Sequence, residues 1–345
     1  MERYIQYLLN HACPSIIFRT KREILGDLEQ CEKQELEKKI MEDQLVKKYL
    51  DLIQCDGWIN KDFHSEEGAE TALRVFTEKG LSGNHPIVAK MLKQFEERKK
   101  TFDQGCMENV GKILDALHLG GSQLIRAVVF AYAGMEEKDF VKEQIELALE
   151  VFQEAATVVS FNRITREYKG KLVFQEEVKW PSIYHLRLLA YTYSWRTETN
   201  NLLIQTAIQQ MIDLSPIPSI NALYKSQVIA PASFAMHHFK VDFEVFEPKD
   251  WMMWFHRMEL LSRIGLVESV SELKRQLDVL IEMLHNNNGI FAKRHSHRYF
   301  TRWSPYTGMA LEKDWRTKER YLCDLYFRSL LIIQYAESEE YSHNY

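Results

Sequence analysis

The chain has 345 residues and a formal net charge of −5, and 46% of its residues are hydrophobic. This is the composition of a globular protein with enough apolar material for a sizeable core. The acidic balance gives no general support for binding nucleic acid or an anionic membrane, because proteins that seek phosphates usually carry a basic excess. The five cysteines are scattered and form no Cys-x-x-Cys pair, which argues against a disulfide framework and a thiolate zinc site.

The N-terminal stretch lacks the apolar core of a signal peptide, and no apolar run approaches the roughly 20 residues that span a bilayer. Scattered cysteines in a chain of this length indicate a reducing compartment. We therefore expect a cytoplasmic protein without a membrane span.

Glycine and proline are scarce, with 14 and 8 residues, which favours long helices over strands and turns. Apolar residues recur at helical spacing along most of the chain. The pattern predicts helices over residues 36–53, 66–79, 86–99, 108–118, 121–133, 138–159, 182–194, 200–213, 252–264, 268–285 and 317–336.

Glycine and proline residues at the expected helix ends support these boundaries. Gly80, Gly134 and Gly265 follow apolar-periodic runs, where a helix can end in the left-handed conformation. Pro86 and Pro181 stand where new helices are expected to begin. Short extended pieces are expected only within 171–180 and 289–303, which are the least helical parts of the chain.

Paired helices with short connections predict a repeated helical hairpin in one continuous domain, residues 1–345. Either an open superhelix or a closed ring of hairpins fits this rhythm. The fold class is therefore all-α, with at most a short β-hairpin.

Two short motifs resemble a known repeat. The stretch 49–58, YLDLIQCDGW, resembles the glutamine–tryptophan repeat of the squalene-cyclase and prenyltransferase superfamily, one residue shorter than usual between Gln54 and the glycine. Residues 284–291, LHNNNGIF, are a weaker echo with His and Phe in place of Gln and Trp. The resemblance, which extends to bacterial members of the superfamily, implies an alpha/alpha toroid or horseshoe of about six helical hairpins, in which the Gln of the repeat caps a helix.

The catalytic signatures of that superfamily are absent. The sequence contains no Asp-x-Asp-Asp acid, no Asp-Asp-x-x-Asp magnesium motif and no zinc set of the prenyltransferase or lanthionine-cyclase kind. It also lacks glycine-rich phosphate loops and common hydrolase motifs. We therefore expect no metal and no cofactor.

Titratable residues crowd the stretch after the first motif. His64 could act as a base, with Asp62 or Glu67 as its partner, so these three are the candidate catalytic residues. The alternative is that the acidic side chains favour the positive end of the following helix.

Aromatic and cationic residues gather near the expected helix ends. Tyr184, Arg187 and Tyr191 are three or four apart and share one helix face. Farther on, Glu259 and Arg263 are expected to pair across one helical turn. Such stripes can also be ordinary core. The candidate ligand-binding residues are Trp58, Tyr184, Arg187, Trp195, Trp254, Arg298, Arg302, Trp303 and Trp315.

Segment 293–303 concentrates basic and aromatic residues in one of the least helical parts of the chain. If the segment is helical, Arg294, Arg298 and Arg302, which are four apart, could meet a phosphate or carboxylate. Interleaved aromatic residues also suit single-stranded nucleic acid. The alternative is a solvated connector whose charges pair with Glu312 and Asp314.

These features predict a concave aromatic and polar pocket that binds or transforms a small anionic or isoprenoid-like ligand. Two other functions stay open: a non-catalytic scaffold that binds a protein or peptide, and nucleic-acid binding through residues 293–303. The sequence does not decide whether the protein is an enzyme.

Overall fold

The computed structural model describes residues 1–97, 105–293 and 297–338. In this part the protein is mostly helical, with two small antiparallel hairpins. The strands are β1 (Thr165–Tyr168), β2 (Lys171–Phe174), β3 (Ala222–Tyr224) and β4 (Gln227–Ile229). The helices are α1 (Glu2–His11), α2 (Pro14–Arg19), the π-helical turn η1 (Thr20–Leu25), α3 (Gln30–Met41), α4 (Gln44–Leu50), α5 (Ala69–Lys79), α6 (Pro86–Glu97), α7 (Val110–Ala116), α8 (Ser122–Tyr132), α9 (Asp139–Ala155), α10 (Ile183–Ala190), α11 (Glu198–Asp213), α12 (Pro248–Ile264), α13 (Ser271–Asn286), α14 (Arg298–Thr301) and α15 (Lys318–Glu337).

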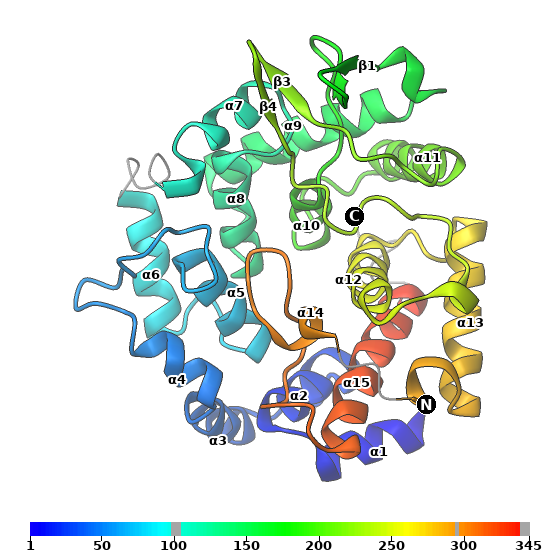
Figure 1. Cartoon of the computed structure of the whole chain (residues 1–345). Coiled ribbons are helices and arrows are strands. Elements are labelled where there is room, and N and C mark those ends of the chain that lie inside the picture. The colour runs from blue at the N-terminus through cyan, green and yellow to red at the C-terminus, as the bar shows by residue number, and fades with distance from the viewer. Residues whose placement is uncertain (98–104, 294–296, 339–345) are drawn as a thin grey trace.

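Six helices contact one another in a closed cycle. Helix α2 packs against α5, α5 against α8, α8 against α10, α10 against α12, α12 against α15, and α15 back against α2. Figure 1 shows these helices around the centre of the view. We call them the inner helices.

The remaining long helices lie outside this cycle (Figure 1). Helix α3 packs on α2, α4 and α6 on α5, α7 and α9 on α8, and α1 and α13 on α15, while α11 packs on α9. Burial follows this arrangement. Every residue of α10 is buried, whereas only Leu36 and Ile40 are buried in α3.

The segment between α14 and α15 crosses the middle of the cycle (Figure 1). We call residues 304–312 the central loop. Its backbone carbonyls accept hydrogen bonds from cationic side chains of three inner helices, which hold it in place. These bonds run from Arg74 to Ser304 and Thr307, from Arg187 to Pro305 and Tyr306, from Arg328 to Met309, and from Lys79 to Leu311.

The predicted helices are present, with one break. The expected helix over 36–53 is divided at Asp43, whose carboxylate accepts hydrogen bonds from the N–H groups of Leu45 and Val46 and so begins α4. The expected stops are confirmed at Gly80 and Gly265, which are left-handed caps of α5 and α12.

The sequence predicted at most one short hairpin, which is wrong, because the described residues form two. Strand β2 lies within the expected extended stretch 171–180, but β3 and β4 form a second hairpin. Its strands have three residues each and turn without an Asn-Gly or Asp-Gly signal, so alternation could not reveal them. The stretch 289–303 holds no strand among its described residues but the short helical turns Gly289–Phe291 and Arg298–Thr301.

The first repeat-like motif folds as a turn after α4. Trp58 is buried and packs edge-on against Phe95 with ring centroids 5.1 Å apart. The side chain of Gln54, however, is exposed and makes no hydrogen bond with the described residues, although the resemblance implies a helix cap. The motif thus has the turn and the buried tryptophan of the repeat that it resembles, but Gln54 does not cap a helix.

Candidate functional site

The inner helices and the turn η1 bring six charged side chains into a closed circuit of ion pairs, which we call the charged ring. Arginine and glutamate alternate, and each side chain pairs with two neighbours at N···O distances of 2.7–3.3 Å. The circuit joins α2, η1, α5, α12 and α15. In order, it runs through Arg19, Glu23, Arg263, Glu259, Arg328 and Glu78.

The expected pair of Glu259 and Arg263 is confirmed as one side of this ring, with an N···O distance of 3.3 Å. Three positive and three negative charges make the ring neutral. Both oxygens of Glu259 are engaged, the second by Arg328 at 2.9 Å. A buried ion pair is stabilising only when such geometry offsets the cost of desolvation.

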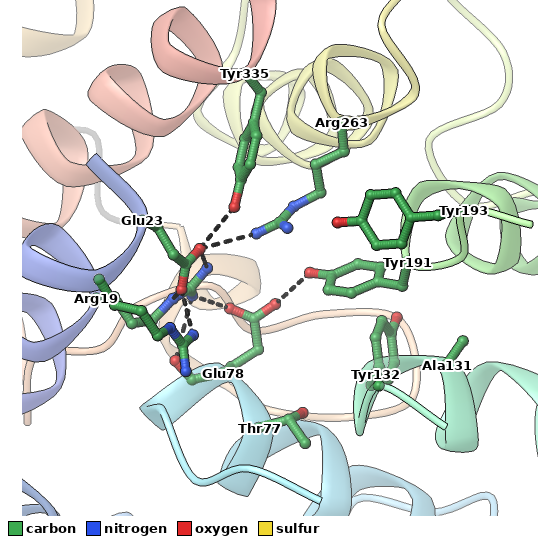
Figure 2. Close-up of a pocket in the computed structure, with 12 residues that line it drawn as sticks. Arg19, Glu23, Thr77, Glu78, Ala131, Tyr132, Tyr191, Tyr193, Arg263 and Tyr335 are labelled. Carbon is green, nitrogen blue, oxygen red and sulfur yellow. Dashed lines mark hydrogen bonds and ion pairs between the residues drawn. The ribbon is translucent and has the colours of Figure 1, made fainter. Parts of the chain in front are cut away.

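A cavity of about 260 Å³, the central pocket, opens beside the charged ring. Four tyrosines line it together with part of the ring (Figure 2). The hydroxyl of Tyr335 donates to Glu23 at 2.8 Å, and that of Tyr191 donates to Glu78 at 3.2 Å. The guanidinium of Arg263 lies 4.6 Å and 4.2 Å from the ring centroids of these two tyrosines.

The carboxylates of the pocket are held ionised. Burial alone would raise the pKa of Glu78, but the guanidinium groups of Arg328 and Arg19 outweigh it and lower that pKa. Glu23 follows the same pattern, with burial opposed by Arg19 and Arg22, and its pKa lies well below the ordinary value. These carboxylates can accept hydrogen bonds at neutral pH, but they are poor proton donors.

A smaller space of about 10 Å³, the inner chamber, adjoins the central pocket and shares Glu78, Tyr132 and Tyr191 with it. It has room for about one water molecule. Arg74 and His256 also line it. Burial, together with nearby guanidinium groups, lowers the pKa of His256 well below its usual value, so this imidazole is neutral.

Arg74 and Arg187 differ from the arginines of the charged ring. Both are buried, yet neither has a carboxylate within 4.0 Å among the described residues. Their recorded partners are carbonyls of the central loop and, for Arg187, the ring nitrogen of His256. The Nε of Arg74 has no hydrogen-bond partner at all in the described part of the chain.

His64 belongs to a second buried cluster on the inner side of α5. Its Nδ1 lies 2.6 Å from a carboxylate oxygen of Glu70, and its Nε2 lies 3.1 Å from the hydroxyl of Tyr306. Tyr184 donates to the other oxygen of Glu70 at 2.5 Å. Burial lowers the pKa of His64, but Glu70 more than offsets this effect and raises it, so the pair can hold a proton.

The structure gives His64 a different partner from those predicted. Glu70 takes the place expected for Asp62 or Glu67. The carboxylate of Asp62 accepts from the backbone N–H of His64, and Glu67 lies at the surface, 3.5 Å from Lys48. The six-residue spacing of His64 and Glu70 crosses the start of α5, so helical periodicity could not reveal the pair.

Of the candidate ligand-binding residues, Tyr184 and Arg187 lie in the interior, where the guanidinium carbon of Arg187 is 4.9 Å from the ring centroid of Tyr184. Trp303 is buried beneath the guanidinium of Arg74, at 4.9 Å. None of the nine lines the central pocket. Trp254 instead borders a separate cavity.

The other tryptophan candidates are core residues. Trp195 donates to backbone carbonyls at the end of α10, and Trp315 donates to Asp324 at 2.6 Å. Both are buried, as is Trp58. The indole N–H groups of Trp195 and Trp315 therefore bond to internal partners.

The helical alternative for the basic segment is not realised in its described residues. Helix α14 ends at Thr301, so Arg298 and Arg302 do not share a continuous helix. Arg302 pairs with Glu66 rather than with Glu312 or Asp314. Residues 294–296 of this segment lie outside the described residues.

Four residues of the charged ring, Arg19, Glu23, Glu78 and Arg328, and the tyrosines Tyr132, Tyr193 and Tyr335 were missed from the sequence. Local pattern gave no signal for them: Glu70, Arg74 and Glu78 are four apart on α5, a spacing that ordinarily indicates a solvent-facing helix side. Only the packing of α5 against the other inner helices turns these charges to the interior. Tyr191, expected on the face of Tyr184 and Arg187, does reach the pocket.

No three His, Cys, Asp or Glu side chains of residues 1–97, 105–293 and 297–338 are grouped so as to hold a metal ion. Within the same ranges no helix has the length and apolar character needed to cross a membrane. Neither protein families nor curated proteins nor solved structures give a match to this chain.

Proposed function

We propose that the protein binds a small anionic molecule in the central pocket. One observation carries this proposal: the side chains lining the central pocket and the inner chamber include more guanidinium groups than carboxylates. The five arginines are Arg19, Arg22, Arg74, Arg263 and Arg328, and the three glutamates are Glu23, Glu78 and Glu259.

The charged ring is neutral, so the surplus comes from Arg22 and Arg74. The side chain of Arg22 is 41% exposed and pairs with Glu23, so water and that carboxylate compensate its charge in part. Arg74 is buried without a carboxylate partner among the described residues, and such a charge is costly unless a counter-charge approaches it. An anion in the central pocket would supply that counter-charge. Arginine is also suited to bidentate contact with carboxylate or phosphate.

The volume of the central pocket and the residues that line it limit the size and chemical class of the ligand. A cavity of about 260 Å³ lies just below the roughly 300–1,000 Å³ that is usual for drug-sized ligands, which favours a small metabolite. Ion pairs and tyrosine hydroxyls dominate the lining, and this supports an anionic ligand rather than an isoprenoid chain. The tyrosines offer hydrogen bonds and flat apolar faces to its uncharged part.

We extend the proposal to the fold family and the cellular location. We propose that the inner helices are the inner layer of an alpha/alpha toroid, with the central loop across its middle. We also place the protein in the cytoplasm, because the side chains of Cys13, Cys31, Cys55 and Cys323 are all free.

The proposal is tested by thermal unfolding with inorganic phosphate and with succinate, each against sodium chloride of equal ionic strength. Either anion should raise the melting temperature, since a ligand at a hundredfold excess over its Kd adds about 2.7 kcal/mol. Tyr132 lines both spaces, and its hydroxyl makes no hydrogen bond with the described residues. Tyr132→Phe should therefore leave the unliganded melting temperature unchanged and weaken anion binding roughly tenfold.

The matched control is Tyr224→Phe, which removes a hydroxyl from the exposed tyrosine of β3. This variant should change neither the melting temperature of the unliganded protein nor its affinity for either anion. If phosphate and succinate do no more than sodium chloride, or if Tyr132→Phe binds them as the unmodified protein does, the anion site is not in the central pocket.

A further inference from the structure

A second and larger cavity, of about 630 Å³, lies outside the cycle of inner helices. It is formed by the start of α12 and by the chain that precedes this helix, residues 215–250. It shares no lining residue with the central pocket. We call it the outer cavity, and the inference drawn from it is independent of the proposed function.

Arg257 is the unusual residue of this cavity. It is buried, and its two terminal nitrogens donate to the backbone carbonyls of Ala235, at 2.7 Å, and His238. No carboxylate lies within 4.0 Å of it among the described residues. A guanidinium has five N–H donors, so these two bonds leave it capacity for another acceptor.

The charge of Arg257 is therefore uncompensated. Burial lowers its pKa to about 10, and no carboxylate opposes that effect. The side chain still carries its proton at neutral pH. Elsewhere in the interior, the buried arginines of the charged ring each pair with two glutamates, and Arg257 has no such partner.

The other charges of the outer cavity are less buried than Arg257. Lys240 and Lys249 are exposed, and Lys249 pairs with Glu247 at 3.1 Å. Asp242 is exposed, and the carboxylate of Asp250 already accepts from the backbone N–H of Glu247 at 3.0 Å. Arg257 is the buried cation among the lining residues, and its one positive charge matches one negative charge on a ligand.

The rest of the wall is apolar. Val241, Phe246, Met253 and Trp254 line it, and the indole N–H of Trp254 is turned to Gln276 at 2.8 Å, so the ring offers only apolar surface. Val245 is 72% exposed and also belongs to the lining, where it adds apolar surface. A ligand with an apolar body would cover these groups.

We infer that the outer cavity binds an amphipathic carboxylate, with the carboxylate beside Arg257 and the hydrocarbon part along Val245, Phe246 and Met253. A single buried positive charge suits a carboxylate better than a phosphate monoester, which carries about −1.5 to −2 at neutral pH. The volume of about 630 Å³ accommodates a chain or ring system of moderate size.

The test uses octanoate as the probe, titrated into the full-length protein with ¹³C-methyl methionine labelling and with calorimetry. The methyl resonance of Met253, assigned with Met253→Leu, should shift on titration. Octan-1-ol has the same chain without the charge and should bind roughly tenfold more weakly, which is the effect of one lost charge-assisted hydrogen bond. Octyl phosphate should bind no more tightly than octanoate.

Two variants locate the site. Val245→Glu puts a negative charge at the rim without disturbing the core and should weaken octanoate binding several-fold with an unchanged melting temperature. Leu202→Glu is the matched control, because Leu202 is a 63% exposed apolar residue of α11. It should bind octanoate like the unmodified protein.

Equal affinity for octanoate and octan-1-ol would overturn the role of Arg257. Tighter binding of octyl phosphate would overturn the carboxylate assignment. Octanoate binding that Val245→Glu leaves unchanged, or that leaves the Met253 resonance in place, would show that the ligand occupies another part of the molecule.

Discussion

At the scale of single residues, the interior carries many charges, and position decides how each one behaves. Glu78 and Glu312 have the same side chain but opposite pKa shifts. Arg328, Arg19, Arg263 and Arg74 hold Glu78 ionised. Glu312 accepts the backbone N–H of Cys13 at 2.7 Å, and burial together with the neighbouring Asp324 raises its pKa to about 7.

This raised pKa predicts a pH dependence. Because the folded-state pKa of Glu312 lies above its ordinary value of 4.5, its stabilising contribution is complete below about pH 4.5 and is lost as the pH rises through about 7. Glu312→Gln keeps an acceptor for Cys13 and stays neutral. The variant should therefore gain in melting temperature relative to the unmodified protein between pH 5 and pH 8.

The comparison is made by thermal unfolding across that range, with Glu35→Gln as an exposed control on α3. The control should track the unmodified protein at every pH. A constant difference between Glu312→Gln and the unmodified protein would mean that Glu312 has the same pKa in the folded and unfolded states, and the raised pKa would be wrong.

At the scale of elements, helix ends decide how neighbours can pack. Gly80 ends α5 with φ +112°, and a Cβ at this position would come within 2.7 Å of the ring of Phe18 on α2. Gly134, just past α8, has φ +73° and open space around the same position. The first glycine thus serves both the turn and the α2–α5 contact, and the second serves only the turn.

Alanine substitutions should separate these two effects. Gly134→Ala should cost about 1–2 kcal/mol, which is the strain of a left-handed non-glycine residue. Gly80→Ala should cost more, since the ring of Phe18 must also move. Chemical denaturation of both variants gives the free energy of unfolding that each one loses. An equal loss in the two variants would show that α2 and α5 adjust freely at this point.

At the scale of the whole molecule, the closed cycle of inner helices predicts a gradient of protection. All eight residues of α10 are buried, whereas α3 buries only two of its twelve. Local opening needs less free energy where fewer apolar contacts are lost. Amide hydrogen exchange followed by mass spectrometry should be slowest in α10, α12 and α15 and much faster in α3.

Exchange in α3 as slow as in α10 would contradict this order. It would mean that the inner and outer helices unfold only together. The expected gradient also bears on binding, because the central pocket is built from the more protected helices and should be largely formed before a ligand enters.

Local pattern was enough to predict most of the helices. Apolar spacing, Gly80, Gly265 and Pro86 gave their positions because helical periodicity and end signals act within a few residues. The break at Asp43 and the hairpin β3–β4 escaped prediction, since a capping side chain inside a periodic run and three-residue strands leave weak local signals.

The site depended on contacts between distant residues. Arg19, Glu78 and Arg328 meet in one circuit although they are far apart in the chain, and sequence spacing can pair only near neighbours such as Glu259 and Arg263. Tryptophans that looked like ligand residues became core because their indole N–H groups found internal partners. The amino-acid order alone thus set where helices run, and the closure of the inner helices decided which charges face one another, since long-range ion pairs exist only once the chain has folded.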